Sequence, residues 1–333
     1  HESKVRAAES ILSLMPKALN RVFFASSGSE SVETALKTAR LMTGRSRVIY
    51  FEGAYHGLGY GALQVTDRNH FRKPFLDDAG RTGIRLPFME CGSDSRLIKK
   101  SIADIQKILK KKNSASAVIL ELIQGRGGVR RADPEWVKQL RKVTKQNKAV
   151  LIIDEIYTGF GRTGSHFAFQ KFGIVPDLLC LGKAMSNGFP ISACVMSRAA
   201  ESAWGKSSGE AKHTSTFLGN PLGCEMIAEV IRQMNQPGTV RHFQRQSAYM
   251  LKALEKLHSA APKEIAAING EGMMFGIVFR KKYKAVLVSK KLLSTGVITL
   301  PCGTHSNVLA LSPSFFITEN EINYLISSIL RII

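Results

Sequence analysis

The chain has few cysteines, no long apolar run, and no repeat or low-complexity segment. Its five cysteines, Cys91, Cys180, Cys194, Cys224 and Cys302, are scattered and show neither a CxxC pair nor metal-ligand spacing. The sequence therefore predicts no disulfide framework and no metal site, and a reducing, cytoplasmic location is the simplest interpretation. No apolar run reaches the roughly 20 residues that a membrane span needs, so we expect no membrane partner.

Acidic residues are also few relative to basic ones. Lys and Arg number 47 against 26 Asp and Glu, and the formal net charge of +21 would suit a protein that binds a polyanion. The lysines, however, gather in stretches such as 107–112, which predict the solvated face and end of a helix. Because no nucleic-acid motif or interleaved aromatic accompanies them, we expect no nucleic-acid partner.

Apolar runs of strand length alternate with helical segments over most of the chain. Strands are predicted at 21–25, 47–51, 116–122, 150–154 and 191–196, and the stretch 64–95 is predicted to be irregular, with a loop tip at 77–80. This alternation is typical of a doubly wound, mostly parallel α/β sheet. We expect a large domain at 1–235 and a smaller α+β domain at 236–333, with strands at 272–279, 297–300 and 308–311.

Two of these strand ends carry reactive side chains. Asp154 ends the apolar run at 150–154, and Lys183 ends a further run of strand length that begins near Pro176. Each alone is more often a solvated strand end, but ligands of open α/β sheets bind outside the carboxyl ends of the strands. A lysine there can lose its proton and form a Schiff base with an aldehyde, while a carboxylate can keep a ring nitrogen protonated. Pyridoxal phosphate requires this pair.

Glycine-containing turns follow three other strands. The turn at 26–30, Ser-Ser-Gly-Ser-Glu, opens a helix and offers backbone N–H groups to a phosphate, although the same pattern caps helices that bind nothing. The turn Tyr55-His56-Gly57 places an aromatic ring at a strand end, where packing is the usual role. A third turn, Gln124-Gly-Arg126-Gly-Gly128, leads into the same crevice.

The segment 154–164, Asp-Glu-Ile-Tyr-Thr-Gly-Phe-Gly-Arg-Thr-Gly, and the segment 181–193, Leu-Gly-Lys-Ala-x-x-x-Gly-Phe-Pro-Ile-Ser-Ala, strongly resemble the class III aminotransferases. These are pyridoxal-phosphate enzymes of fold type I, and the resemblance covers nearly the whole chain. It implies that Lys183 carries the cofactor as a Schiff base, that Asp154 pairs with the pyridine nitrogen, and that Ile156 packs on one face of the ring.

The resemblance also assigns further cofactor contacts. It implies that Ser27, Gly28 and Ser29 bind the cofactor phosphate and that Tyr55 stacks on the ring opposite Ile156. Two more residues, His56 and Glu121, are assigned to positions beside the cofactor. Of these, His56 is interpreted as a structural neighbour of the cofactor and not as a proton carrier.

The segment 213–221 resembles a family motif whose threonine reaches across a dimer interface to the partner's cofactor phosphate, a role that falls on Thr216. We therefore expect a homodimer with shared active sites. Members of the family usually carry a further N-terminal segment that contributes to the small domain and the substrate pocket. We expect that this numbering begins inside a longer protein or that the segment is missing.

Three departures from the family pattern bear on the substrate. Arg126 stands where many relatives have a Glu, and Ala310 stands where many have the Arg that binds a substrate carboxylate. One hypothesis is that Arg126 supplies an anion contact from the opposite wall; the alternative is that it points to solvent or to Glu155. The third departure is Tyr157, where relatives often have a Gln near the phenolic oxygen of the cofactor.

The sequence thus predicts transamination from an amine or amino-acid donor to a 2-oxo acid or aldehyde acceptor. An aminomutase, a decarboxylase or a phospho-lyase would use the same residues, and a catalytically silent binding or regulatory homologue is a further alternative.

Overall fold

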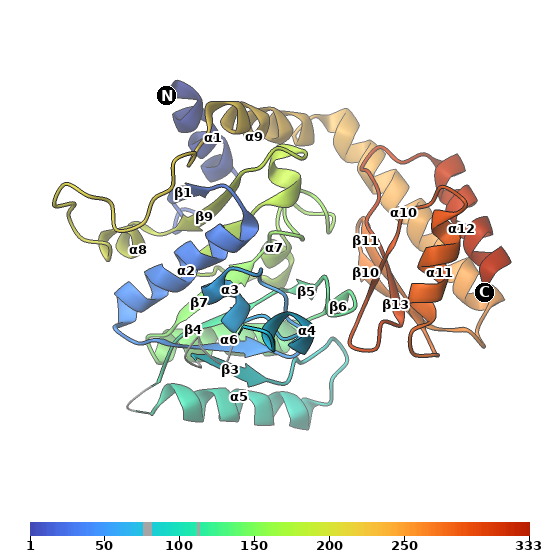
Figure 1. Cartoon of the computed structure of the whole chain (residues 1–333), viewed down its shortest axis with the longest axis horizontal. Helices are drawn as coiled ribbons and strands as arrows, with labels where there is room; N and C mark the ends of the chain where they lie inside the picture. The colour runs from blue at the N-terminus through green and yellow to red at the C-terminus, as the bar shows by residue number, and fades with distance from the viewer. Residues whose placement is uncertain (76–81, 112–113) are drawn as a thin grey trace.

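The computed structural model describes residues 1–75, 82–111 and 114–333. In these residues the chain forms a larger part built on a seven-stranded sheet and a smaller part built on a four-stranded sheet (Figure 1). The loop tip predicted at 77–80 lies outside the described residues.

The large sheet has the strand order β1-β9-β8-β7-β4-β2-β3. Its strands are β1 (Arg21–Ala25), β2 (Arg47–Phe51), β3 (Gly83–Leu86), β4 (Ala115–Leu120), β7 (Val150–Asp154), β8 (Leu178–Leu181) and β9 (Ser192–Met196). Neighbours from β3 to β8 pair in parallel, and only β9 runs against its neighbours β1 and β8. The prediction of a mostly parallel α/β sheet is confirmed.

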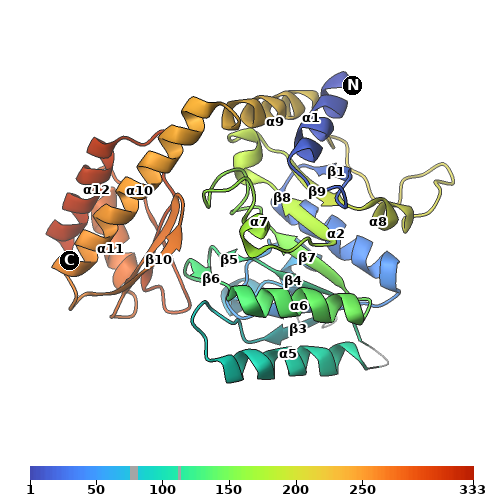
Figure 2. The same cartoon turned by 180° about the vertical axis from the view of Figure 1, so that it is seen from behind.

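Helices cover both faces of the large sheet. Helix α2 (Gly28–Thr43) lies on one face, and α5 (Ser95–Leu109) and α6 (Pro134–Gln146) lie on the other (Figures 1 and 2). Helices α1 (Glu2–Ser13) and α9 (Pro221–Met234) pack against each other beyond β1.

The shorter elements of this part are α3 (Tyr60–Gln64), α4 (Asn69–Arg72), α7 (Ala168–Phe172), η1 (Lys183–Ser186), α8 (Arg198–Ser202), and the strand pair β5 (Ile123–Gln124) and β6 (Arg130–Arg131). Among the described residues, no helix combines the length and the apolar character needed to cross a bilayer.

Residue alternation along β7 decides the direction in which Asp154 points. Val150 and Ile152 belong to the buried cluster on the α2 side, while Leu151 and Ile153 belong to the cluster on the α6 side. Because successive side chains of a strand point to opposite faces, Asp154 continues the α2 side. The sheet therefore directs this carboxylate toward the first turn of α2.

The smaller part contains β10 (Ile265–Glu271), β11 (Met274–Phe279), β12 (Leu300–Cys302) and β13 (Val308–Leu311), together with α10 (Pro237–Ala260), α11 (Lys284–Leu293) and α12 (Glu319–Ile332). The three helices lie on the outer side of this sheet, and its other side faces the larger part (Figures 1 and 2). Leu254, Phe275, Ile277 and Ile322 share its buried core. We place the domain boundary between residues 235 and 236 as a proposal, because α9 packs with the large part and α10 with the small one.

Three strands differ from the sequence prediction. Residues 83–86, in the stretch predicted to be irregular, form β3 at the edge of the large sheet beside β2. Residues 265–271, where no strand is predicted, form β10 and pair with β11. The strand predicted at 297–300 begins only at Leu300. The pairing of each strand with its neighbour supplies the stability that its own sequence pattern does not indicate.

Candidate active site

A cavity of about 560 Å³ lies beyond the carboxyl ends of β7 and β8. It brings together ten of the twelve residues assigned to the site from the sequence: Gly28, Ser29, Tyr55, His56, Glu121, Arg126, Asp154, Ile156, Tyr157 and Lys183. The other two, Ser27 and Thr216, do not line it. Segments far apart in the sequence therefore converge on one crevice.

Asp154 is held in a fixed orientation at the floor of this cavity. One carboxylate oxygen lies 2.7 Å from Nδ1 of His56, and the other accepts a hydrogen bond of 3.0 Å from the backbone N–H of Ile156. Both side chains are buried, and His56 Nε2 has no hydrogen-bond partner among the described residues. The contact between His56 and Asp154 is not indicated by any sequence pattern. It presents the carboxylate to the cavity in one orientation.

Lys183 begins the short helix η1 directly after β8 and Gly182. Its φ of 44° is in the left-handed region, a conformation that costs energy for a residue with a side chain and that is often found at functional sites. Its Nζ lies 4.8 Å from the centroid of the Tyr157 ring. Burial lowers the pKa of the Lys183 amine, Asp154 and Glu121 oppose this effect, and the charge of Arg126 adds to it. The amine is therefore easier to deprotonate than an exposed lysine.

The first turn of α2 forms one wall of the cavity. Ser27 caps the helix by accepting a hydrogen bond of 3.3 Å from Glu30 N–H, and Ser29 Oγ accepts one of 2.9 Å from Gly59 N–H. Gly57 has a φ of +114°, and a Cβ there would lie 3.0 Å from Ser29 Cα, so only glycine allows this approach. The first amides of an α-helix have no acceptor within the helix, which makes this turn suitable for an anion.

Glu121 connects two loops behind the cavity. Its oxygens accept hydrogen bonds of 3.0 Å from the backbone N–H groups of Tyr55 and Gly125. Burial raises its pKa to about 7, against a smaller opposing effect of His56. Glu121 thus fixes the position of the loop that carries Tyr55, whose ring packs edge-on against Phe71.

Arg126 also lines the cavity, with its guanidinium 5.8 Å from the centroid of the Tyr55 ring. The alternative partner considered from the sequence, Glu155, accepts its hydrogen bonds from Thr158 and from the backbone of Ala168 and Phe169. The structure therefore places Arg126 at the cavity and shows no contact between it and Glu155.

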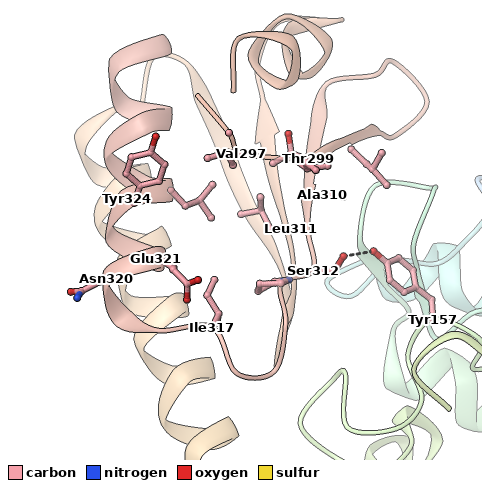
Figure 3. Close-up of a pocket in the computed structure, with 15 residues that line it drawn as sticks. Tyr157, Val297, Thr299, Ala310, Leu311, Ser312, Ile317, Asn320, Glu321 and Tyr324 are labelled. Carbon is pink, nitrogen blue, oxygen red and sulfur yellow. Dashed lines mark hydrogen bonds between the residues drawn. The ribbon is translucent and has the colours of Figure 1, made fainter. Parts of the chain in front are cut away.

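A second cavity, of about 670 Å³, adjoins the first and shares Tyr157, Leu300 and Ala310 with it. It lies between β13 and α12 and has a mainly apolar lining that includes Val297, Leu311 and Ile317 (Figure 3). The hydroxyl of Tyr157 donates a hydrogen bond of 2.9 Å to Ser312 Oγ across the two parts of the molecule (Figure 3). This interaction places Tyr157, which the sequence alone leaves without a position.

Thr216 is exposed on the segment before α9, and the adjacent Phe217 is 70% exposed. Its position outside this chain's own cavity agrees with the expected role across an interface but does not test it.

The sequence analysis did not identify three residues of the cavity wall, Leu58, Leu300 and Cys302. It also did not identify Ser312, the hydrogen-bond partner of Tyr157. Leu58 directly follows the turn Tyr55-His56-Gly57, and Ser312 lies two residues after Ala310, so sequence position could have pointed to both. No motif surrounds Leu300 or Cys302, so only the folded chain identifies them.

Comparisons with known proteins agree with this geometry. The family model described as aminotransferase class-III matches residues 1–333. The chain is 33% identical over 322 residues to an acetylornithine aminotransferase of Methanosarcina acetivorans, covering 97% of this chain and 74% of that protein. It is 35% identical over 330 residues to a LysW-aminoadipate semialdehyde/glutamate semialdehyde transaminase of Sulfolobus acidocaldarius, covering 95% of this chain and 77% of that protein.

A solved structure of a transaminase from the marine bacterium Virgibacillus matches with a TM-score of 0.89 and 23% identity, covering 99% of this chain and 78% of that one. At 23% sequence identity, this structural similarity shows that the two chains share a fold.

Proposed function

The chain belongs to the class III aminotransferases, which transfer amino groups with pyridoxal phosphate, and we propose that Lys183 and Asp154 perform this transfer in the cavity described above. The observation that carries the assignment is the convergence of both residues, from the ends of neighbouring strands, on one cavity. We propose a terminal amine or an amino acid as donor and a 2-oxo acid or aldehyde as acceptor. A relative named for two semialdehydes supports a terminal carbonyl group.

The residues present suit this cofactor. A volume of about 560 Å³ is within the range of about 300–1,000 Å³ that small-molecule sites occupy. We propose that Gly28 and Ser29 bind the phosphate with Ser27 capping the turn, and that Tyr55 and Ile156 contact the two faces of the ring. Asp154 would pair with the ring nitrogen and Lys183 would hold the cofactor.

The proposed chemistry depends on the protonation of the Lys183 amine and on the orientation of the Asp154 carboxylate. When bound, pyridoxal phosphate acts as an electron sink for the carbon that loses a proton. Lys183 Nζ, with a pKa lowered by burial, accepts that proton and returns it. The Asp154 carboxylate, oriented by His56 and the Ile156 amide, favours a positive charge at the ring nitrogen. Glu121 keeps the Tyr55 loop in place throughout.

Two further residues would contact the substrate. Arg126 faces the cavity and can offer two parallel N–H donors to a carboxylate. Tyr157 lies beside Lys183, and its hydroxyl is held by Ser312. We propose that Arg126 sets the orientation of an anionic substrate and that Tyr157 borders its reacting end.

We also propose a homodimer in which Thr216 of each chain reaches the cofactor phosphate of the other. The position of Thr216 supports the idea, because it is exposed and does not line the cavity of its own chain. The five cysteines are all unpaired thiols, which supports our proposal of a reducing, cytoplasmic location.

A variant at Asp154 tests the assignment. The protein loaded with pyridoxal phosphate would be mixed with an amine and a 2-oxo acid, and the new amino acid measured by chromatography. We expect Asp154→Asn to lower kcat by about 100-fold or more, the order of effect seen when one preorganised electrostatic contact is removed. Circular dichroism would verify that the variant folds. Equal turnover of a folded variant and the parent protein would refute the role of Asp154.

A further inference from the structure

An arginine-rich cavity of about 720 Å³ adjoins the cofactor cavity. Arg126 lines both, and Arg68, Arg72 and Arg85 line the arginine-rich one. The acidic residue found among its described lining residues is Asp67. The cationic side chains therefore outnumber the acidic one in a concave site that shares Arg126 with the cavity of Lys183.

Two of these arginines, Arg85 and Arg72, already donate hydrogen bonds to neighbouring side chains. Arg85 forms ion pairs with Asp67 and, at 2.9 Å, with Glu52, and Asp67 also accepts a hydrogen bond of 2.8 Å from Gly53 N–H. Arg72 donates to the hydroxyl of Tyr50. The single lining carboxylate is thus committed to Arg85 and does not neutralise the rest of the cavity.

Arg72 has only its neutral tyrosine partner, and Arg68 and Arg126 also form no ion pair among the described residues. Arg68 donates a hydrogen bond of 2.7 Å to the carbonyl of Gly303, a neutral acceptor, and the guanidinium of Arg126 lies beside the Tyr55 ring. Both side chains are half-buried. Burial lowers the pKa of Arg68, and the charge of Arg126 lowers it further, so the two cations lie close enough to repel each other.

A turn of the small domain contacts both residues, through the side chain of Arg68 and the backbone of Arg126. Gly303 accepts the hydrogen bond from Arg68, and its own N–H donates a bond of 3.0 Å to the backbone carbonyl of Arg126. One turn therefore contacts both arginines at the junction of the two domains. Two half-buried cations that repel each other become more favourable when an anion pairs with them.

We propose that Arg68 and Arg126 form a binding site for the anionic group at the far end of the substrate, a carboxylate or a phosphate, while the amine end lies at Lys183. This inference rests on the proposed function, because it assigns the two cavities to the two ends of one substrate. Arg126, which lines both cavities, determines the direction in which the substrate lies.

Matched substrate pairs test the site. The donors would be 4-aminobutanoate and 3-aminopropyl phosphate, each compared with the uncharged butylamine, and the measured quantity is the ratio of kcat/KM for the charged donor to that for butylamine. We expect Arg68→Gln and Arg126→Gln each to lower this ratio by roughly 10- to 100-fold, the size of one hydrogen bond to a charged group. The donor with the larger ratio in the parent protein identifies carboxylate or phosphate as the preferred anion.

Arg45 provides a control variant. It is also half-buried and donates only to backbone carbonyls, those of Ala115 and Asn147, but it lies outside both cavities. Arg45→Gln should leave the ratio unchanged. A ratio unchanged in both Arg68→Gln and Arg126→Gln would overturn the proposal, as would an equal loss in Arg45→Gln.

A binding measurement separates this proposal from the function on which it rests. Calorimetry with butanedioate and with inorganic phosphate should show binding of at least one of them to the cofactor-loaded parent protein, and a loss of about tenfold or more in affinity for that anion in the double variant. Turnover of butylamine with no anion binding would overturn the anion site and leave transamination intact. Anion binding without turnover of any donor would support the site and contradict the proposed function.

Discussion

At the scale of single residues, burial determines the behaviour of the charged groups around the cavity. Burial lowers the pKa of the Lys183 amine and raises the pKa of the Glu121 carboxyl, and both shifts favour the neutral form. Asp154, in contrast, has a hydrogen-bonding group beside each of its two oxygens. A neutral amine and a supported carboxylate are the two states that the proposed proton transfer requires. The sequence identifies these residues by their motifs, but their protonation depends on side chains contributed by other strands.

Glu155 allows a test of the effect of burial on a carboxyl group that is not one of the reacting groups. Burial raises its pKa from the ordinary 4.5 to about 7. Between pH 4.5 and pH 7 the folded protein therefore binds more protons at Glu155 than the unfolded chain does. The stability that protonated Glu155 contributes is fully present below pH 4.5 and is lost as the pH rises through 7. We expect the unfolding free energy to fall by about 3 kcal/mol more from pH 4.5 to pH 8 in the parent protein than in Glu155→Gln. Urea unfolding at several pH values measures this difference, and parallel curves for the two proteins would contradict it.

At the scale of elements, the first turn of α2 meets the loop after β7. A Cβ at Gly28 would lie 3.0 Å from Cδ1 of Ile156, so the absence of a side chain allows Ile156 to approach the helix. The sequence predicts Gly28 as a phosphate contact, whereas its packing against Ile156 follows only from the register of the sheet.

Gly28→Ala should therefore weaken cofactor binding. The added methyl group pushes Ile156 from its place beside the proposed ring position, at a cost of about 1.4 kcal/mol, which is a tenfold rise in Kd. Fluorescence titration of the unloaded protein with pyridoxal phosphate measures this change.

Gly238→Ala is the matched control, because Gly238 has open space around it and lies in α10. Its Kd should equal that of the parent protein. An unchanged Kd in Gly28→Ala would show that Ile156 does not depend on this glycine.

The elements also show what the sequence could and could not predict. The strands that carry Asp154 and Lys183 are continuous buried runs, and both are predicted because a fully buried parallel strand needs an apolar sequence. The pattern in β3 is weak because it is four residues long and its Arg85 is half-exposed, and that in β10 is weak because only Ile265 is buried. Such strands form because a neighbour pairs with them. The hydrogen bond between Tyr157 and Ser312 joins positions 155 residues apart, and no local pattern encodes such a distance.

At the scale of the whole molecule, the cavity lies where the two parts meet. Arg162, just beyond β7, donates hydrogen bonds to the carbonyls of Met273 and Pro313 in the small part, at 3.1 and 2.7 Å. Tyr157 and Arg126 make the further contacts with Ser312 and Gly303 described above. The position of the small part therefore sets the shape of the substrate site.

A mixed dimer tests whether two chains complete each site. If Thr216 acts on the partner's cofactor, Lys183→Ala and Thr216→Ala chains should each be weakly active alone. Mixed dimers should recover activity, because one of their two sites combines an intact Lys183 with an intact Thr216 from the other chain. Unfolding and refolding the two variants together, followed by an activity assay, measures the recovery. A particle of twice the 36.6 kDa chain mass should appear in sedimentation.

Two results would contradict the shared site. Sedimentation as a monomer would exclude it, and so would a mixture no more active than the sum of its separate components. Refolding each variant alone under the same conditions is the control.

The central claim is that Lys183, among the many lysines of a basic chain, is the one that holds the cofactor. Borohydride treatment of the protein loaded with pyridoxal phosphate turns a lysine–cofactor linkage into a stable amine, and mass spectrometry of the digested protein then locates it. We expect the added mass on the peptide that contains Lys183 and its loss in Lys183→Ala. A label confined to another lysine, or no label at all, would contradict the account.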